Sequence, residues 1–326
     1  MQAGRFKMRV LITGMNGFGG GHLADLLLAE TPWTLIGASR NATGDRGSGR
    51  VSWWNIDLRD RDGARRLLMV ERPNLIAHLA AQPYVPAAWE NPWETFEHNV
   101  RPLQNLFDGL LATGLTPRIL VVSTNEVYGP PRGDADLPFR EDRLPRPTNP
   151  YGVSKVAQEA LALQYRRSHG LDVVVARPFN HIGPRQLMNS VANQFAQQVA
   201  EIEAGRREPV IKVGNMTAAR DFTDVRDVAR AYYALMQLGE AGEVYNICSG
   251  QPRNVQSLLD ALLALARIKI TVEVDPEKLR PADTPVSYGS NEKLRATTGW
   301  APTIPFEQTV ADLLADWRAR VAAAAP

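Results

Sequence analysis

The chain has 326 residues, 44% of them hydrophobic and 22% charged, a composition typical of a globular protein with a sizeable core. Its formal net charge of +2 gives no reason to expect a nucleic acid or an anionic membrane as a partner. The single cysteine, Cys248, excludes an internal disulfide, and the cysteine and histidine content offers no zinc-like cluster, so we predict no metal site. No apolar run approaches the roughly 20 residues that span a bilayer. These features predict a cytoplasmic protein of two domains, or of one large α/β unit with an appended lobe.

The first motif joins a strand, a glycine-rich turn and a helix. Residues 9–13 form a short apolar run of the kind that is buried on both faces of a sheet, and apolar residues recur at helical spacing over 21–28. Between them, Gly14, Gly17 and Gly20 keep the spacing of a dinucleotide-binding turn. Glycines there permit a tight turn and let a pyrophosphate approach the helix N-terminus, where free N–H groups favour an anion.

The second strand, 34–39, indicates which dinucleotide binds. It ends at Arg40, and no acidic residue lies there to hydrogen-bond the ribose hydroxyls of NAD. An arginine at this point accommodates the 2′-phosphate of NADP, so we favour NADPH. The alternative is an arginine that stacks on adenine and tolerates both cofactors, which keeps NADH as a second candidate.

Strands and helices alternate through the rest of the first half. We expect strands that end at 58, 79 and 123, and helices over 60–70 and 93–111. Asp57 has two interpretations, a contact with the adenine amine or a loop-capping carboxylate. His78 lies inside its strand and is interpreted as a core residue. The alternation predicts a Rossmann-type doubly wound parallel sheet in an α/β fold, with ligands at the carboxyl ends of the strands.

Tyr151 and Lys155 lie four residues apart, just after an Asn-Pro pair. If a helix begins at Tyr151, both side chains share one face. A fixed ammonium beside a phenol favours the phenolate and moves its pKa toward working pH, as general acid–base chemistry requires. An isolated pair of this spacing would be better interpreted as surface residues. Here Thr124 and the other strand-end residues converge on the same edge of the sheet, and this convergence predicts a catalytic site.

On these motifs the chain resembles the extended short-chain dehydrogenase/reductase family, in its nucleotide-sugar branch. The resemblance covers nearly the whole chain. It implies that Thr124 hydrogen-bonds the substrate oxygen, that Tyr151 passes the proton, and that Lys155 also holds the nicotinamide ribose. The predicted cofactor contacts are Gly14, Asn16, Gly17, Phe18, Gly20, Arg40, Asp57, Leu58, Leu79, Ala80, Ala81, Asn99, Tyr151, Lys155, Pro178 and His181.

Within that branch, residues 179–185, 213–215, 220–227 and 279–283 resemble GDP-4-keto-6-deoxy-D-mannose reductases, which form GDP-D-rhamnose. The resemblance implies that Arg220 and Arg280 hold the GDP end of the substrate, and arginine forks match phosphate oxygens in two-point contacts. It also implies a homodimer built on the helices after Trp93 and after Tyr151. The predicted substrate contacts are Thr124, Asn125, Asn180, Arg185, Asn193, Lys212, Arg220, Arg280 and Asp283.

Glu126 keeps alternative functions open. Dehydratases of this branch use a glutamate here to take a proton from C5 of the sugar. The structural interpretation is that Glu126 is a buried hydrogen-bond partner of the Tyr128 loop. Asn125 stands where dTDP-sugar dehydratases carry an acidic residue. We therefore interpret the chain as an NADPH-dependent C4-keto reductase. The alternatives are a GDP-mannose 4,6-dehydratase, a reductase that forms GDP-6-deoxy-D-talose, another nucleotide-sugar epimerase, and a non-catalytic dinucleotide sensor.

We expect two interleaved domains. The NADP-binding domain comprises residues 1–178 and about 210–250, with a helix over 227–238 and a strand over 243–247. A smaller mixed α/β lobe that binds the nucleotide sugar comprises about 179–209 and 251–326, with a last helix over 305–320.

Overall fold

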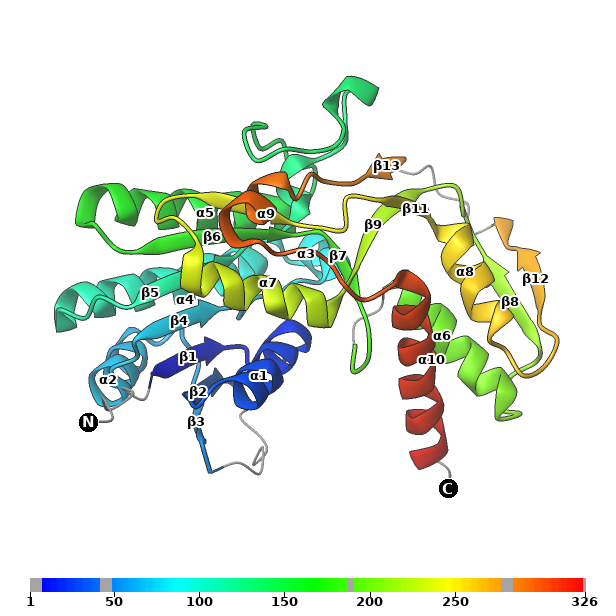
Figure 1. The fold of residues 1–326 in the computed structure, drawn as a ribbon, viewed down its shortest axis with the longest axis horizontal. Helices are drawn as coiled ribbons and strands as arrows, with labels where there is room; N and C mark the ends of the chain where they lie inside the picture. The colour runs from blue at the N-terminus through cyan, green and yellow to red at the C-terminus, as the bar shows by residue number, and fades with distance from the viewer. Residues whose placement is uncertain (1–7, 42–48, 187–189, 277–283, 325–326) are drawn as a thin grey trace.

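The computed structural model describes residues 8–41, 49–186, 190–276 and 284–324. Seven parallel strands form the main sheet, in the order β10-β6-β5-β4-β1-β2-β3 (Figure 1). The order reverses between β1 and β4, as in the doubly wound fold that the alternating pattern predicts. The strands are β1 (Arg9–Thr13), β2 (Thr34–Ser39), β3 (Val51–Asn55), β4 (Leu75–His78), β5 (Arg118–Val122), β6 (Val173–Pro178) and β10 (Val244–Ile247).

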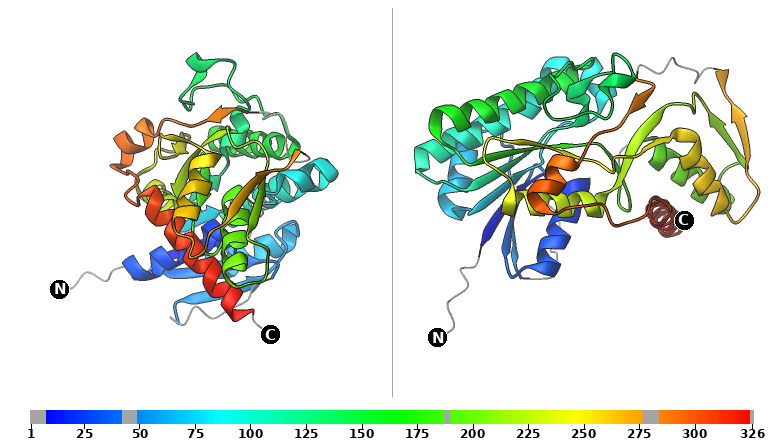
Figure 2. Two further views of the ribbon diagram at one scale, coloured as in Figure 1. Left: turned by 90° about the vertical axis from the view of Figure 1, so that its right-hand side faces the viewer. Right: turned by 45° about the horizontal axis from the view of Figure 1, so that its top comes forward.

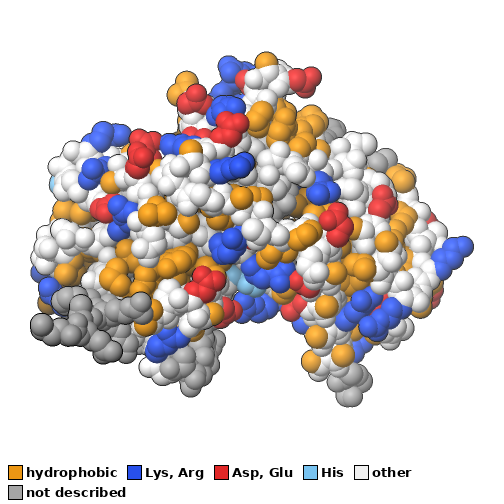
Figure 3. Space-filling model, viewed as in Figure 1, with side chains coloured by type: hydrophobic (Ala, Val, Ile, Leu, Met, Phe, Trp, Pro, Cys, Tyr) orange, Lys and Arg blue, Asp and Glu red, His pale blue; other side chains and the backbone are white. Residues whose placement is uncertain are grey.

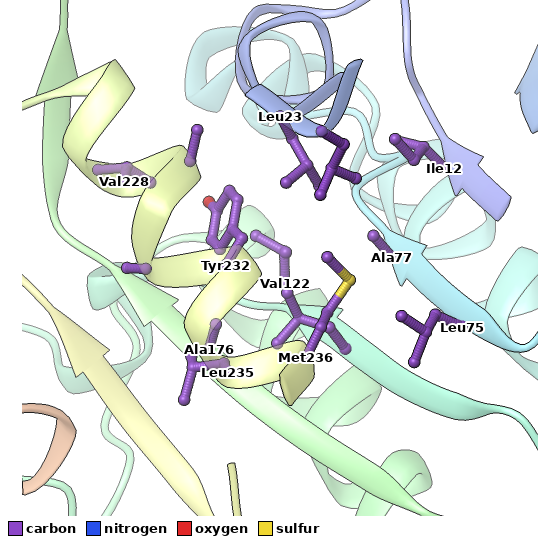
Figure 4. Close-up of a cluster of buried hydrophobic side chains, with 14 of the residues drawn as sticks. Ile12, Leu23, Leu75, Ala77, Val122, Ala176, Val228, Tyr232, Leu235 and Met236 are labelled. Atoms are coloured by element: carbon purple, nitrogen blue, oxygen red, sulfur yellow. The ribbon is translucent and has the colours of Figure 1, made fainter. Parts of the chain in front are cut away.

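Helices cover both faces of this sheet because its strands are apolar on both sides. On one face, Leu23 of α1 (Phe18–Glu30) and Tyr232 of α7 (Val225–Leu238) pack over Ile12, and Figure 4 shows their buried cluster. On the other face, Leu11 packs with α2 (Arg61–Glu71), α4 (Pro92–Thr113) and α5 (Pro150–His169). The short helix α3 (Val85–Glu90) precedes α4.

The remaining elements build a smaller lobe beside the sheet. Three helices, α6, α8 and α10, share one apolar core. Figure 2 shows the β8–β12 ribbon on the far side of this lobe from the main sheet. The lobe elements are β7 (Asn180–Ile182), α6 (Val191–Glu203), β8 (Val210–Val213), β9 (Ala219–Asp224), β11 (Pro252–Asn254), α8 (Val255–Ala264), β12 (Thr271–Val274), β13 (Val286–Ser287) and α10 (Phe306–Ala323).

The chain returns to the main sheet later than expected. The predicted cofactor domain resumes at about 210, but β8 pairs with β12, and β9 pairs with β7, β11 and β13, all outside the seven-stranded sheet. The return to that sheet begins with α7 and β10. Leu294 of α9 (Glu292–Thr298) then joins the core under α1 and α7. The exact division into two domains stays a prediction.

Over the described ranges, none of the helices is both long enough and apolar enough to cross a membrane.

Candidate active site

The glycine turn links β1 to α1 and fits closely against the chain that follows β4. Gly14 has a left-handed φ of +70°, and a Cβ built on it would lie 3.1 Å from the backbone of Ala80. A Cβ on Gly20 would lie only 2.3 Å from the Gly14 carbonyl oxygen. Gly17 N–H donates to that same oxygen at 2.9 Å. The turn therefore keeps its shape only because these positions carry no side chain.

The first turn of α1 suits a bound anion. Gly17 is its N-cap residue, no side chain caps the helix, and no acidic residue occupies the first turn of this described helix. Exposed N–H groups and the helix dipole there favour a phosphate. Arg40 lies exposed directly after β2. The backbone at this helix end thus fits a pyrophosphate, and the Arg40 side chain fits the 2′-phosphate of NADPH.

Tyr151 and Lys155 project from the first two turns of α5. Asn149 caps this helix, since its side-chain oxygen accepts from the Gly152 N–H at 2.8 Å, and Pro150 opens it. Pro150 has the fixed φ that suits a first helical position. Both side chains are buried, with Tyr151 8% and Lys155 2% exposed. The spacing thus places them together on one helix, as expected.

The Tyr151 phenol hydrogen-bonds with Thr124, which follows β5. Burial raises the pKa of Tyr151, Glu126 raises it further, and the bond to Thr124 opposes them. The expected shift of this pKa toward neutrality is therefore wrong for the isolated chain. At neutral pH Tyr151 is a protonated phenol, whose chemistry is that of a proton donor.

Lys155 makes its contacts deeper in the sheet. Its Nζ donates to the Val122 carbonyl and to Gln158 Oε1, both at 2.8 Å. Burial lowers the pKa of Lys155 to about 7, and the nearby Glu159 partly opposes this effect. The lysine can therefore exchange its proton near neutral pH, which general acid–base chemistry requires.

A buried polar network continues below Lys155 along the same helix face. Glu159 accepts from Arg177 Nε at 2.9 Å and Nη2 at 2.7 Å, and it also accepts from the Ser123 hydroxyl. Arg177 Nη1 donates to the Tyr128 hydroxyl at 2.9 Å, and that hydroxyl donates to Asn246 at 2.7 Å. Paired charges can be buried because each group has its partners. The network fixes the strand end from which Thr124 extends.

Glu126 lies beside the predicted catalytic pair. Its Oε2 accepts from Asn149 Nδ2 at 2.8 Å. Burial lowers the pKa of Arg220 and the Glu126 charge raises it, so the two charges face the same region. Asn125 Nδ2 lies 3.4 Å from the Ser287 hydroxyl of β13. The structure therefore joins lobe residues to the sheet edge that carries the predicted catalytic residues.

Asn180 and His181, on β7, also approach this edge. The side-chain oxygen of Asn180 is buried and has no partner among the residues that the structure describes. The His181 ring stacks on Phe18 at 5.6 Å between ring centroids, with 5° between the planes. His181 therefore contacts the first residue of α1, close to the glycine turn.

Several predicted residues are engaged elsewhere in the isolated chain. Asp57 accepts from Arg59 Nη2 at 2.6 Å and from the Arg59 backbone N–H at 2.9 Å, so it caps its own loop. Arg185 forms an ion pair with Asp25 at 2.6 Å.

Figure 3 shows a hollow between the α1 and α10 regions, with basic and histidine side chains at its upper end.

The other predicted contacts are spread over several parts of the chain. Asn16 Nδ2 donates to the Asn41 carbonyl at 2.9 Å, at the end of β2. Asn193 is buried and accepts from Trp317 Nε1 at 2.5 Å, whereas Lys212 is exposed on β8. Arg280 and Asp283 lie outside the described residues. The remaining predicted contacts lie on β-strand ends or their following loops: Leu58, Leu79, Ala80, Ala81 and Pro178.

Asn99 holds α4 against α5. Its Oδ1 accepts from the Gln82 N–H at 2.7 Å, and its Nδ2 donates to the Ser154 hydroxyl at 2.8 Å. Gln158 Nε2 donates to the Asn99 carbonyl at 2.9 Å. The sequence reasoning missed Gln158, although its position three residues after Lys155 on a helix was a usable signal. It also missed Ser154 and Gln82, which have no such spacing.

Comparison with known proteins identifies related sequences and related solved structures. The family model described as GDP-mannose 4,6 dehydratase matches residues 11–313. The chain is 39% identical to "GDP-6-deoxy-D-mannose reductase" of Pseudomonas aeruginosa, over 96% of this chain and 98% of that protein. It superposes on the solved structure "RMD from Pseudomonas aeruginosa complexed with NADPH" with a TM-score of 0.87, 37% identity, and coverage of 96% and 100%. The structure of a UDP-glucose 4-epimerase from Thermus thermophilus, solved with NAD, gives a TM-score of 0.83 at 31% identity. That alignment covers 95% of this chain and 99% of the epimerase chain.

Proposed function

Because the chain belongs to the GDP-mannose 4,6-dehydratase family of extended short-chain dehydrogenases/reductases, we propose that it reduces a nucleotide sugar with NADPH. The proposed reaction converts the C4 keto group of GDP-4-keto-6-deoxy-D-mannose to the alcohol of GDP-D-rhamnose. The 39% identity to a GDP-6-deoxy-D-mannose reductase, over nearly the full length of both chains, supports this substrate.

The raised pKa of Tyr151 agrees with a role as proton donor in a ketone reduction. Burial raises the pKa of Tyr151, so the isolated chain holds a protonated phenol. Reduction of a ketone needs a proton donor at the carbonyl oxygen, whereas the oxidation that begins a dehydratase cycle needs a base to remove a hydroxyl proton. A protonated phenol suits the first reaction.

The proposed mechanism assigns one role to each side chain. NADPH, when bound, supplies the hydride that forms the new C–H bond at C4. Tyr151 donates its phenolic proton to the oxygen as the C=O bond becomes an alkoxide, and Thr124 orients that oxygen through its hydroxyl. Lys155, one helical turn from Tyr151 and with its pKa lowered to about 7, is assigned the return of a proton to the Tyr151 phenolate. Arg220 is proposed to bind the diphosphate, and Glu126 opposes its charge.

The first experiment measures NADPH absorbance while the purified protein is mixed with freshly prepared GDP-4-keto-6-deoxy-D-mannose. A reductase consumes one NADPH per sugar reduced, and product stereochemistry then distinguishes GDP-D-rhamnose from GDP-6-deoxy-D-talose. The matched control replaces Tyr151 by Phe. Conversion of GDP-mannose to the keto sugar without net NADPH loss would instead identify a dehydratase and give Glu126 the central role.

We also propose a cytoplasmic homodimer formed through α4 and α5. These two helices pack side by side on one face of the main sheet. Trp93, at the start of α4, is 75% exposed and stacks on Phe96, and Val153 of α5 is 47% exposed. Exposed large apolar side chains on neighbouring helices are typical of an interface. Sedimentation of the wild type and of Trp93→Glu tests this proposal, since the variant should be monomeric.

A further inference from the structure

Arg40 and His98 meet across the edge of the main sheet, where the adenosine end of the cofactor is expected. Arg40 follows the last residue of β2, and His98 lies in the second turn of α4. Arg40 Nη1 lies 3.1 Å from His98 Nε2. The imidazole is only 13% exposed, whereas Arg40 is an exposed residue. A fixed ring on a helix thus contacts a long, otherwise exposed side chain.

The second ring nitrogen determines which group donates. His98 Nδ1 lies 2.9 Å from the Glu94 carbonyl oxygen, which can only accept a hydrogen bond. The proton of the neutral ring therefore sits on Nδ1, and Nε2 keeps a lone pair. Arginine has donors only, so Arg40 donates to His98. The histidine has one orientation and one tautomer that satisfy both contacts.

Two nearby carboxylates are held by other arginines, and a third, that of Glu94, lies 3.8 Å from His98 Nδ1, the ring nitrogen that does not face Arg40. Asp57 binds Arg59 through its side chain at 2.6 Å and 3.0 Å, and its pKa is lowered chiefly by that contact, with Arg40 the weakest of the causes. Glu97 accepts from Arg101 at 2.7 Å. Arg40 is thus held by a neutral acceptor, which fixes its position without cancelling its charge. An acidic partner would compete with a phosphate for the guanidinium, and a neutral partner does not.

We propose that His98 is a positioning residue that sets the preference for a 2′-phosphorylated dinucleotide by holding Arg40 in place. One N–H of Arg40 is used by His98, and the guanidinium has further N–H groups for the three acceptor oxygens of a 2′-phosphate. A pre-positioned side chain loses less conformational freedom when the ligand binds, so the affinity is higher. The inference rests on the NADPH cofactor of the proposed function, but not on the substrate or the catalytic step.

The test measures dissociation constants of NADPH and NADH by fluorescence titration, at one salt concentration, without substrate. NADH lacks the 2′-phosphate and is the internal control. His98→Leu should weaken NADPH binding about 3- to 10-fold and leave NADH within about 2-fold. His98→Gln, which retains a neutral acceptor, should recover part of the loss. Equal losses for the two dinucleotides would overturn the proposal, because they would indicate general damage to the site.

A double-mutant cycle establishes whether His98 acts through Arg40. Arg40→Ala alone should weaken NADPH binding more than His98→Leu does. In the Arg40→Ala background, His98→Leu should then have no further effect on NADPH, because nothing remains to be positioned. A full additional loss in that background would refute the assigned role. The binding assay remains decisive even if the protein fails to reduce the proposed sugar.

Discussion

Replacing Gly20 by alanine tests whether the shape of the glycine turn controls cofactor binding. The new Cβ would lie 2.3 Å from the Gly14 carbonyl oxygen and 3.0 Å from Met15 Cα. To reach even a 3.0 Å separation, the carbonyl must retreat by about 0.7 Å, the difference between 3.0 and 2.3 Å. Both atoms belong to backbone, so no side chain can rotate away. Overpacking of this kind costs about 1–3 kcal/mol.

The retreating carbonyl also accepts the Gly17 N–H, so the turn that we propose presents N–H groups to the pyrophosphate changes shape. We expect Gly20→Ala to lower the free energy of unfolding by about 1–3 kcal/mol in urea. We also expect the NADPH dissociation constant to rise about tenfold or more, since about 1.4 kcal/mol corresponds to a factor of ten.

Gly19→Ala is the matched control one residue earlier in the same helix. Its Cβ would lie 3.5 Å from a Leu79 methyl group, an ordinary van der Waals contact. Alanine is favoured over glycine in a helix by roughly 0.5–1 kcal/mol, so stability should hold or increase. NADPH affinity should stay within about twofold. Wild-type affinity and stability in Gly20→Ala, or equal damage in Gly19→Ala, would refute the steric argument.

Three further outcomes follow from the site and its supports. Tyr151→Phe should reduce single-turnover NADPH oxidation by at least about 100-fold while the NADPH dissociation constant changes little, and retained turnover would exclude Tyr151 as the proton donor. Burial lowers the pKa of Lys155 from 10.5 to about 7, so the unfolded chain binds the extra proton between these values and the free energy of unfolding should rise with pH there. Lys155→Met should remove that rise. If urea denaturation gave the variant and the wild type the same increase in unfolding free energy with pH, the prediction would be contradicted. Asp221→Asn should lower the free energy of unfolding by about 2–3 kcal/mol, because Asp221 accepts from the Ser249 and Gly250 N–H groups and an amide offers one acceptor fewer; unchanged urea midpoints would disprove this.

The sequence was sufficient for the features that depend on local pattern. Apolar runs predicted β1, β2, β4, β5 and β10 of the main sheet, whereas β6 was not predicted and β3 ends at Asn55 rather than at Leu58. The Asn-Pro pair predicted the start of α5 and hence the shared helix of Tyr151 and Lys155. The parallel alternation then implied that strand ends meet at one edge, which brings Thr124 to Tyr151.

Features that depend on tertiary contacts could not be predicted from the sequence. Burial raises the pKa of Tyr151, and the distant Tyr232 of α7 lies close enough for its own pKa to respond to Tyr151. The Lys155 ammonium donates to Val122 and Gln158. The β9 segment lies within the 210–250 range that was assigned to the cofactor domain, yet it pairs outside the main sheet. Local pattern does not specify which strand a segment pairs with, since several partners can satisfy the same backbone groups.

The late return of α7 and β10 to the main sheet has a consequence for biosynthesis. Chain synthesis reaches β6 at residue 178, but the sheet lacks its last strand until Ile247 has been made. Until then β6 presents a bare strand edge, and the α1 face lacks Tyr232 and Leu235 of α7. Exposed edges and apolar faces on nascent chains are sites of misassociation. A ribosome-bound chain stopped before residue 225 should therefore recruit chaperones, and one extended past α9 should release them.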